Sequence, residues 1–436
     1  MSGATGTAAG TDLLVTGIGQ LVDFGSGGPA DPPEVVEDAY VWIREGRVAA
    51  RGPARGIPDE AAGAARLDAA GGVVLPGLVD SHTHAVFGGT REHEFERRLA
   101  GTSYQEIAAA GGGILWSVRD LRARGDDELL ALTAARLAES VRWGVTTVEV
   151  KSGYGLTVED ELRTLRIVRR LDQGPGLPRV VPTFLGAHAV PPEFGGDRAG
   201  YVRRVVDEML PAVAEEGLAR FCDVFCDEGA FTPAEAETIL VRAGELGLGL
   251  KLHADEFAGL GGARLAARLG AVSADHLVAI DAAGIEALAN GGTVATLLPG
   301  TSFFLRLGRF APARRLADAG ATVALATDFN PGSSMTQNLL LMAAFGCCLM
   351  GLRIDEALRA VTRGGARALA RDDLGTLAPG AAGDLAVFTV PDYRHLVYHY
   401  GVGHVAAVVR GGRPIGPVPG RSGPAPVGWR HPEAAD

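Results

Sequence analysis

The stretch VVLPGLVDSHTH, residues 73–84, decides the fold and also introduces the chemistry. It starts as an apolar run typical of a buried strand and ends in His82 and His84, which are two residues apart. Side chains two apart on an extended strand point to the same side, so both imidazoles would face one point. The stretch alone leaves two interpretations open: a metal site, or a polar strand end that meets solvent.

Outward from this stretch, apolar strands alternate with segments that carry Ala, Leu, Glu and Arg at helical spacing. Eight such strand–helix units predict a (β/α)8 TIM barrel. The segments before and after it read as short strands separated by turn residues, so we expect a small β-sandwich built from both chain ends. The predicted domains are 1–75, 76–372 and 373–436. The predicted barrel strands are 73–80, 145–151, 179–186, 220–226, 248–253, 271–275, 293–298 and 321–327.

Composition limits the possible partners and the location of the protein. The net charge of −11 argues against binding to nucleic acid or to an anionic membrane. The longest apolar run, residues 339–352, is shorter than the roughly 20 residues that span a bilayer, and we expect it to form a buried helix. The N-terminus lacks the features of a signal peptide. Four cysteines without paired spacing predict buried, reduced thiols, and we therefore expect a soluble, cytoplasmic protein.

Polar residues collect at the ends of the predicted strands, where a TIM barrel carries its active site. Five of the ten histidines fall there. Neutral imidazoles and a carboxylate suit Zn²⁺ or Fe²⁺, and a catalytic site keeps one position open for water. We predict that Glu256 holds or relays the proton of that water, and that His276 hydrogen-bonds the water or the developing oxyanion. The predicted metal ligands are His82, His84, His253 and Asp328.

This pattern resembles the amidohydrolase superfamily, with HxH on strand one, histidines on strands five and six, and aspartate on strand eight. Many members hold two metal ions, bridged by a carbamylated lysine at the end of strand four. Here strand four ends in FCDVFCDEG (221–229), which has no lysine, and Lys151 belongs to strand two. The departure favours a single metal ion.

Longer stretches resemble the imidazolonepropionase family, in order along residues 12 to 410. They are HTHAVFGGTREHEFERRLAGTSYQEIAAAGGGI (82–114), EVKSGYGL (149–156), TFLGAHAVP (183–191), HADEF (253–257), SADHL (273–277) and ATDFNPGS (326–333). The resemblance implies hydrolysis of the cyclic amide of 4-imidazolone-5-propanoate to N-formimidoyl-L-glutamate by attack of a metal-bound hydroxide. It also implies one zinc or iron ion per subunit. The choice of metal and the oligomeric state stay open, with a homodimer as one option.

The resemblance also implies roles for individual residues. The substrate carries a propanoate, and Arg91 could pair with a carboxylate, although a loop arginine is also typical of a solvated surface charge. The match of GGTR to the family assigns Arg91 to substrate binding. The other expected substrate-binding residues are Tyr154, His188, Glu256, Asn330, Gly332 and Ser333. The expected catalytic residues are Glu256, His276, Asp328 and His188, and the sequence leaves open which of the first three is the general base.

Two alternatives remain. The first is a deaminase of the same superfamily that acts on a guanine- or cytosine-like heterocycle, for which the cation Arg91 and Tyr154 would be unnecessary. The second is an inactive, assembly-forming relative, which would be expected to have lost metal ligands, whereas all four predicted ligands are present.

Overall fold

The computed structural model describes residues 12–25, 31–102, 106–107, 110–172 and 174–416. Eight parallel strands follow one another in chain order around the predicted barrel. Beyond the strand ends, the N–H of His84 donates to the carbonyl of Phe329 at 2.9 Å, which ties the first strand to the last. The expected fold class is therefore confirmed. The strands are β6 (Leu78–Asp80), β7 (Val145–Lys151), β8 (Arg179–Ala187), β9 (Phe221–Cys226), β10 (Gly249–Ala254), β11 (Ser273–His276), β12 (Val294–Leu297) and β13 (Val323–Leu325).

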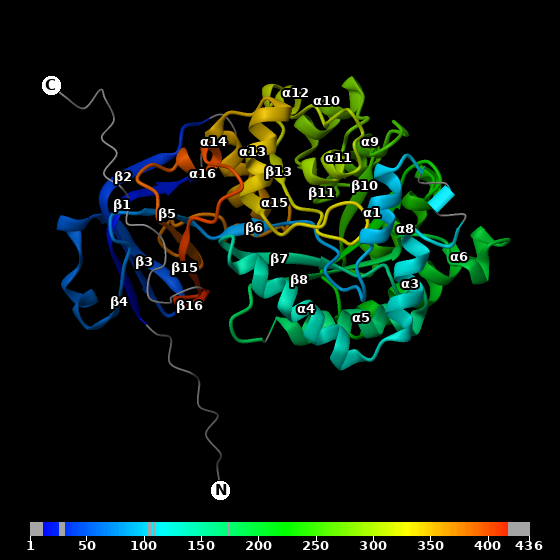
Figure 1. Ribbon diagram of the computed structural model, residues 1–436, viewed down its shortest axis with the longest axis horizontal. Coiled ribbons are helices and arrows are strands. Elements are labelled where there is room, and N and C mark those ends of the chain that lie inside the picture. Colours follow the sequence, from blue (N-terminus) through cyan, green and yellow to red (C-terminus); the bar gives the residue numbers. More distant parts are fainter. Residues whose placement is uncertain (1–11, 26–30, 103–105, 108–109, 173, 417–436) are drawn as a thin grey trace, which may run out of the picture.

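Helices cover the outside of the barrel, with α4 and α5 beside β7 and β8 and α13 beside β13 (Figure 1). Local sequence sets where several of them begin. At α8, Thr232 accepts from the N–H of Glu235, whose carboxylate accepts in return from the N–H of Thr232. The α-helices are α1 (Glu92–Leu99), α3 (Ile114–Ala123), α4 (Asp126–Val141), α5 (Val158–Leu171), α6 (Arg198–Arg204), α7 (Leu210–Glu215), α8 (Pro233–Glu245), α9 (Gly262–Arg268), α10 (Ala282–Gly291), α11 (Pro299–Phe304), α12 (Ala313–Asp318), α13 (Leu339–Met350), α14 (Ile354–Arg359), α15 (Gly365–Arg367) and α16 (His395–Tyr398). Single π-helical turns, η4 (Val205–Met209) and η5 (Ala360–Gly364), and short 3-10 turns, η1 (Ala54–Gly56), η2 (Asp59–Gly63) and η3 (Pro192–Phe194), complete the set.

Both ends of the chain contribute to one mixed sheet that lies beside the barrel (Figure 1). Its strands run in the order β16-β15-β14-β5-β1-β2-β3, and β4 pairs with β1. The hairpin of β2 and β3 folds back onto the chain before β14, where the N–H of Val48 donates to the carbonyl of Ala381. The predicted sandwich thus forms as one continuous sheet around its own apolar cluster. Its strands are β1 (Leu13–Asp23), β2 (Glu34–Arg44), β3 (Arg47–Pro53), β4 (Ala65–Asp68), β5 (Val73–Pro76), β14 (Leu385–Phe388), β15 (Val405–Arg410) and β16 (Arg413–Gly416).

The predicted strand 73–80 is divided between the two sheets at Gly77. Its first part is β5, paired with β1 and β14, and its second part is β6, the first strand of the barrel. A Cβ atom at Gly77 would lie 2.1 Å from Oγ1 of Thr146, so the chain can cross from one sheet to the other only where no side chain is present. The N–H of Gly77 also donates to the carbonyl of Asp384, which holds the crossing point.

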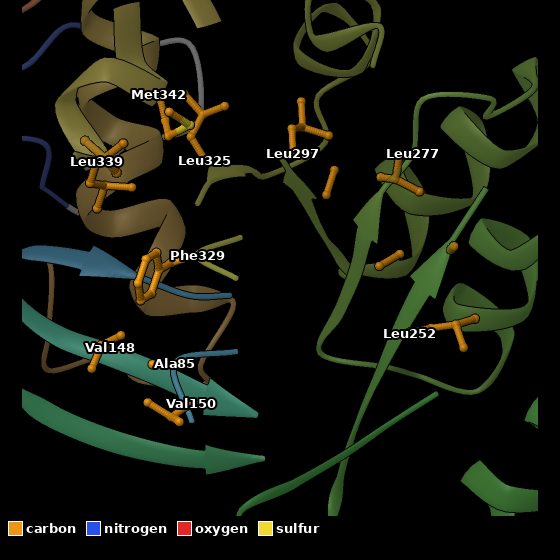
Figure 2. Packing of buried hydrophobic residues seen from close by; sticks show 14 of the residues in the cluster. Ala85, Val148, Val150, Leu252, Leu277, Leu297, Leu325, Phe329, Leu339 and Met342 are labelled. Carbon is orange, nitrogen blue, oxygen red and sulfur yellow. The ribbon is translucent and has the colours of Figure 1, made fainter. Parts of the chain in front are cut away.

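The barrel and its helices share the largest apolar core. Val148 and Val150 of β7, Leu252 of β10 and Phe329 beyond β13 belong to it (Figure 2). Of the predicted buried thiols, Cys222 and Cys226 are buried, but Cys348 is exposed and Cys347 is half-buried. That part of the prediction is wrong because Cys347 and Cys348 lie on the solvent-facing side of α13. The helix is apolar along its whole length, so its sequence does not indicate which residues are exposed.

Within the described ranges, none of the helices combines the length and the apolar character needed to cross a bilayer.

Candidate metal centre

The predicted metal ligands come together at the carboxyl ends of the barrel strands. Nε2 of His82 lies 3.3 Å from Nε2 of His84, and Oδ1 of Asp328 lies 3.5 Å and 3.4 Å from these two nitrogens. Ligand atoms about 2.1 Å from a zinc ion are roughly 3.0 to 3.6 Å apart when four protein groups and one water surround the ion. The spacing of the three atoms therefore fits a common metal ion.

His253 completes the predicted ligand set, and its surroundings also fit a cation. The ring is buried and its centroid lies 4.5 Å from that of His82; neither ring nitrogen makes a hydrogen bond of good geometry among the described residues, although Nδ1 lies 2.9 Å from Oδ2 of Asp223. A buried imidazole nitrogen without a partner costs stability unless a bound group satisfies it. His276 also lies close: with His82 and His253 it forms a second group whose donor atoms are all within 4.8 Å of one another.

Burial favours the neutral form of His82, His84 and His276, and metal ligation requires neutral imidazoles. Desolvation lowers the pKa of His82 well below its ordinary value and also lowers the pKa of His84. It lowers the pKa of His276 to about 3. Burial would raise the pKa of Asp328, but its hydrogen bonds with His84 and Thr301 and the electrostatic effect of the neighbouring imidazoles outweigh burial and lower that pKa to about 2. The centre thus presents the neutral imidazoles of His82, His84 and His276 beside the Asp328 carboxylate.

Backbone strain concentrates at the same place. Asp328 has a φ of 50° and His276 a φ of 76°, values that non-glycine residues rarely adopt. Strained backbone of this kind persists where the surrounding structure fixes it, and it gathers at functional sites. Here it occurs at His276, the last residue of β11, and at Asp328, three residues after the end of β13, and both side chains lie at the centre.

Asp275 and Asp223 orient two of the predicted ligands through the Nδ1 side of their rings. Neither aspartate was singled out by sequence reasoning. Oδ2 of Asp275 lies 2.6 Å from Nδ1 of His82, and Oδ2 of Asp223 lies 2.9 Å from Nδ1 of His253. Each contact leaves Nε2 of its histidine facing the centre. Metal-ligating histidines usually have such a partner, which fixes the tautomer and the orientation of the ring.

Both lysines of the chain lie fully buried behind these carboxylates. Nζ of Lys151 is 2.7 Å from Asp223, 2.9 Å from Glu149 and 3.7 Å from Asp275. Nζ of Lys251 is 2.8 Å from Glu149 and donates to the carbonyl of Ser81 at 3.0 Å. His82, Glu149 and Asp275 are also spaced to hold a cation, but both lysine ammonium groups already lie within 4 Å of Glu149, and that of Lys151 also lies within 4 Å of Asp275.

Glu256 lies beside the ligand set. Its Oε2 is 3.5 Å from Nε2 of His276. Burial raises the pKa of Glu256 well above its ordinary value, and the negative charges of Asp328 and Asp227 raise it further. A buried carboxyl group next to a metal centre, with a pKa raised above that of a solvated glutamate, is a candidate proton carrier.

The predicted substrate residues line two sides of the centre. The ring of His188 stacks on that of His84 with centroids 5.1 Å apart, and Tyr154 lies 5.4 Å from His188. Nδ1 of His188 is 3.0 Å from the carbonyl oxygen of Gly153, which orients the ring.

On the other side, the loop after Asp328 reaches Arg91. The Asn330 side chain holds this loop: its Oδ1 accepts from the N–H groups of Gly332 and Ser333, both at 2.8 Å, and its Nδ2 donates to Oγ of Ser333. The structure thus uses the Asn330 amide within the loop itself. A Cβ atom at Gly332 would lie 2.5 Å from Nη1 of Arg91, so the glycine is what allows the guanidinium to approach.

Arg91 itself is buried and fixed by Glu94, another residue that sequence reasoning missed. Nε and Nη2 of Arg91 donate to Oε2 of Glu94 at 2.9 Å and 2.6 Å. Oε1 of Glu94 accepts from the N–H of Gly113 at 2.9 Å. The three-residue spacing on α1 is the signal that could have shown this pair.

Comparison with known proteins agrees with this architecture. A model of the amidohydrolase family matches residues 107–415. The chain is 47% identical over 386 residues to an imidazolonepropionase from Geobacillus kaustophilus, covering 87% of this chain and 91% of that one. It is 50% identical over 395 residues to one from Anaeromyxobacter, covering 90% and 93%. A crystal structure of an adenosine deaminase from Xanthomonas campestris with bound zinc shares the fold at a TM-score of 0.69 and 21% identity, covering 93% of this chain and 92% of that one.

Proposed function

Because this chain belongs to the imidazolonepropionase family of amidohydrolases, we propose that its metal centre opens the ring of 4-imidazolone-5-propanoate with Glu256 as the proton carrier. The chain is a hydrolase that acts on a cyclic amide, and its product is N-formimidoyl-L-glutamate. The small-molecule substrate follows from the family. The residue roles given below are proposals.

His82, His84, His253 and Asp328 would hold one zinc or iron ion. When bound, the cation lowers the pKa of a water molecule toward about 7 and polarises the carbonyl group of the ring. The observation that carries the assignment is the spacing of the ligand atoms of His82, His84 and Asp328, together with the unpartnered Nε2 of His253.

Three residues compete for the role of general base, and their surroundings separate them. Asp328 has a pKa of about 2, and His276 has a pKa of about 3, so both are weak proton acceptors at neutral pH. Glu256 has a raised pKa and lies 3.5 Å from His276. Glu256 would take one proton from the attacking water and give it to the ring nitrogen as the amide C–N bond breaks. His276 would then orient the Glu256 carboxyl group or hydrogen-bond the carbonyl oxygen.

The substrate would be held at both ends. Glu94 binds Nε and Nη2 of Arg91, and Gly332 leaves space beside Nη1. Arg91 would bind the propanoate through the N–H groups that Glu94 does not occupy. His188 and Tyr154 would contact the ring beside His84. The buried Arg91 favours this substrate over the neutral heterocycle of the deaminase alternative. Because none of the four cysteines is paired, we also expect the enzyme to work in the cytoplasm.

The test uses freshly generated 4-imidazolone-5-propanoate and follows the loss of its ultraviolet absorbance. Metal-replete wild-type enzyme should consume the substrate without releasing ammonia. Glu256→Gln should keep its metal ion and lose turnover by about 10²- to 10⁴-fold, the usual contribution of a general base. His253→Ala should lose metal. Ammonia release, or near-normal turnover by Glu256→Gln, would contradict the proposal.

A further inference from the structure

Asp227 follows β9 and binds the loop that carries Glu256. Its Oδ2 accepts from the N–H groups of Glu256 at 2.7 Å and Phe257 at 3.0 Å. Its Oδ1 accepts from the N–H groups of Ala258 at 3.1 Å and Glu228 at 2.7 Å. The carboxylate is only 2% exposed. Four backbone donors on one buried carboxylate make a strong and directional clamp.

Asp227 holds the N-terminal end of the loop, which carries the proposed proton carrier Glu256. The other end is held by Asp255, whose Oδ1 accepts from Gly261 and Gly262 and whose Oδ2 accepts from Ala263. Asp255 therefore fixes the start of α9, whereas Asp227 fixes the backbone of Glu256 itself. Both aspartates are 2% exposed, and each binds at least three backbone N–H groups.

β9 and the residue that follows it thus support two functional residues, one on the neighbouring strand β10 and one in the loop after it. Asp223 lies within β9, and its Oδ2 is 2.9 Å from Nδ1 of His253 while its Oδ1 accepts from the N–H of the same residue. Asp227 comes four residues later and holds Glu256. β9 has no lysine; Asp223 on this strand lies behind a proposed metal ligand, and Asp227 directly after the strand lies behind the proposed proton carrier.

Building on the role proposed for Glu256, we propose that Asp227 is a positioning residue for the hydrolysis: it holds the backbone of Glu256 so that the carboxyl group faces His276. Its carboxylate oxygens accept from backbone N–H groups of Glu228, Glu256, Phe257 and Ala258, which are not among the proposed metal ligands. Its charge acts in addition to its position. The groups that face Glu256 are His276 on β11, Asp328 beyond β13 and Asp227 beyond β9, and the two aspartates both raise the pKa of Glu256.

The test compares Asp227→Asn with Asp255→Asn, the same exchange at an equally buried site of the same loop. Asp227→Asn replaces one acceptor oxygen by an amide group that repels the backbone donors. It should lower kcat by about 100-fold, the effect of roughly 1 Å of misplacement, with metal content and KM within about twofold of wild type. The acid limb of its kcat/KM profile should move to lower pH. Asp255→Asn should leave that limb in place and lower kcat much less.

Two further variants separate position from charge and from folding. Asp227→Glu keeps the charge but moves it by one methylene, so kcat should fall without a shift of the acid limb. In the double variant Asp227→Asn/Glu256→Gln, the Asp227 exchange should cause no further loss, because it acts through Glu256. Equal kinetics of Asp227→Asn and Asp255→Asn, or a full further loss in the double variant, would overturn the inference. Normal turnover of Glu256→Gln would instead overturn the proposed role of Glu256.

Discussion

Replacing Lys151 with methionine should destabilise the metal-free protein more than the same change at Lys251, the only other lysine. Both side chains are fully buried, so burial alone does not distinguish them. Their partners do. Lys151 is the one lysine or arginine within 4 Å of Asp223 among the described residues, whereas Glu149 is bound by both lysines.

The magnitude follows from which carboxylate is left unpaired. Without Lys151, Asp223 keeps no lysine or arginine within 4 Å among the described residues, and breaking a buried ion pair by removing one partner costs about 3–5 kcal/mol. Without Lys251, Glu149 still has Lys151 at 2.9 Å, and the main loss is the hydrogen bond to the carbonyl of Ser81, which costs about 1–3 kcal/mol. The surrounding carboxylates also raise the pKa of Lys151 despite its burial, so the side chain is charged at every relevant pH.

The assay is urea unfolding of chelator-treated protein, followed by the fluorescence of the four tryptophans. Lys151→Met should lower the free energy of unfolding by about 3–5 kcal/mol, clearly more than Lys251→Met. Equal losses in the two variants would refute the reasoning, because the paired carboxylates would then have no part in the difference.

Three further predictions address the site itself. Gly332→Ala places a Cβ atom 2.5 Å from Nη1 of Arg91 and should displace the guanidinium that binds the propanoate. In steady-state kinetics KM should rise about tenfold, equivalent to 1.4 kcal/mol, while kcat stays nearly constant. An unchanged KM would argue against propanoate binding by Arg91. Asp275→Asn removes the carboxylate behind His82 and should weaken metal binding about 10- to 100-fold in competition with a chromophoric chelator, and wild-type affinity would contradict its orienting role. Burial lowers the pKa of His188 in the folded protein well below its ordinary value of 6.5. As the pH falls below 6.5, the His188 side chain of the unfolded chain binds a proton and that of the folded protein does not, so the free energy of unfolding falls. Between pH 7.5 and 5.5, metal-free wild type should therefore lose about 1.4 kcal/mol relative to His188→Asn in urea unfolding, and equal losses would count against a neutral buried imidazole.

The sequence predicted the barrel and the position of the centre because two simple rules apply to it. Apolar runs mark the strands of a parallel barrel, and the polar residue that ends each run must lie at the same edge as its neighbours. His82, His253 and Asp328 follow such runs directly. The break at Gly77 could not be read in the same way, since VVLPGLV is uniformly apolar and only the neighbouring Thr146 shows why the chain changes sheets there.

The residues behind the centre escaped prediction for a different reason. Asp275 and His82 are 193 positions apart, and Asp227 and Glu256 are 29 apart, so no local spacing connects them. An aspartate inside an apolar strand has no signature that tells an orienting carboxylate from a structural one. Their roles emerge only when parallel strands bring their ends together.

The most direct test of the central claim is to titrate metal-free enzyme with Zn²⁺ or Fe²⁺ while measuring the hydrolysis of 4-imidazolone-5-propanoate. One ion held by His82, His84, His253 and Asp328 predicts no turnover in chelator and a linear return of activity that reaches its maximum at one equivalent per chain. A maximum at two equivalents, or full activity in chelator, would contradict it.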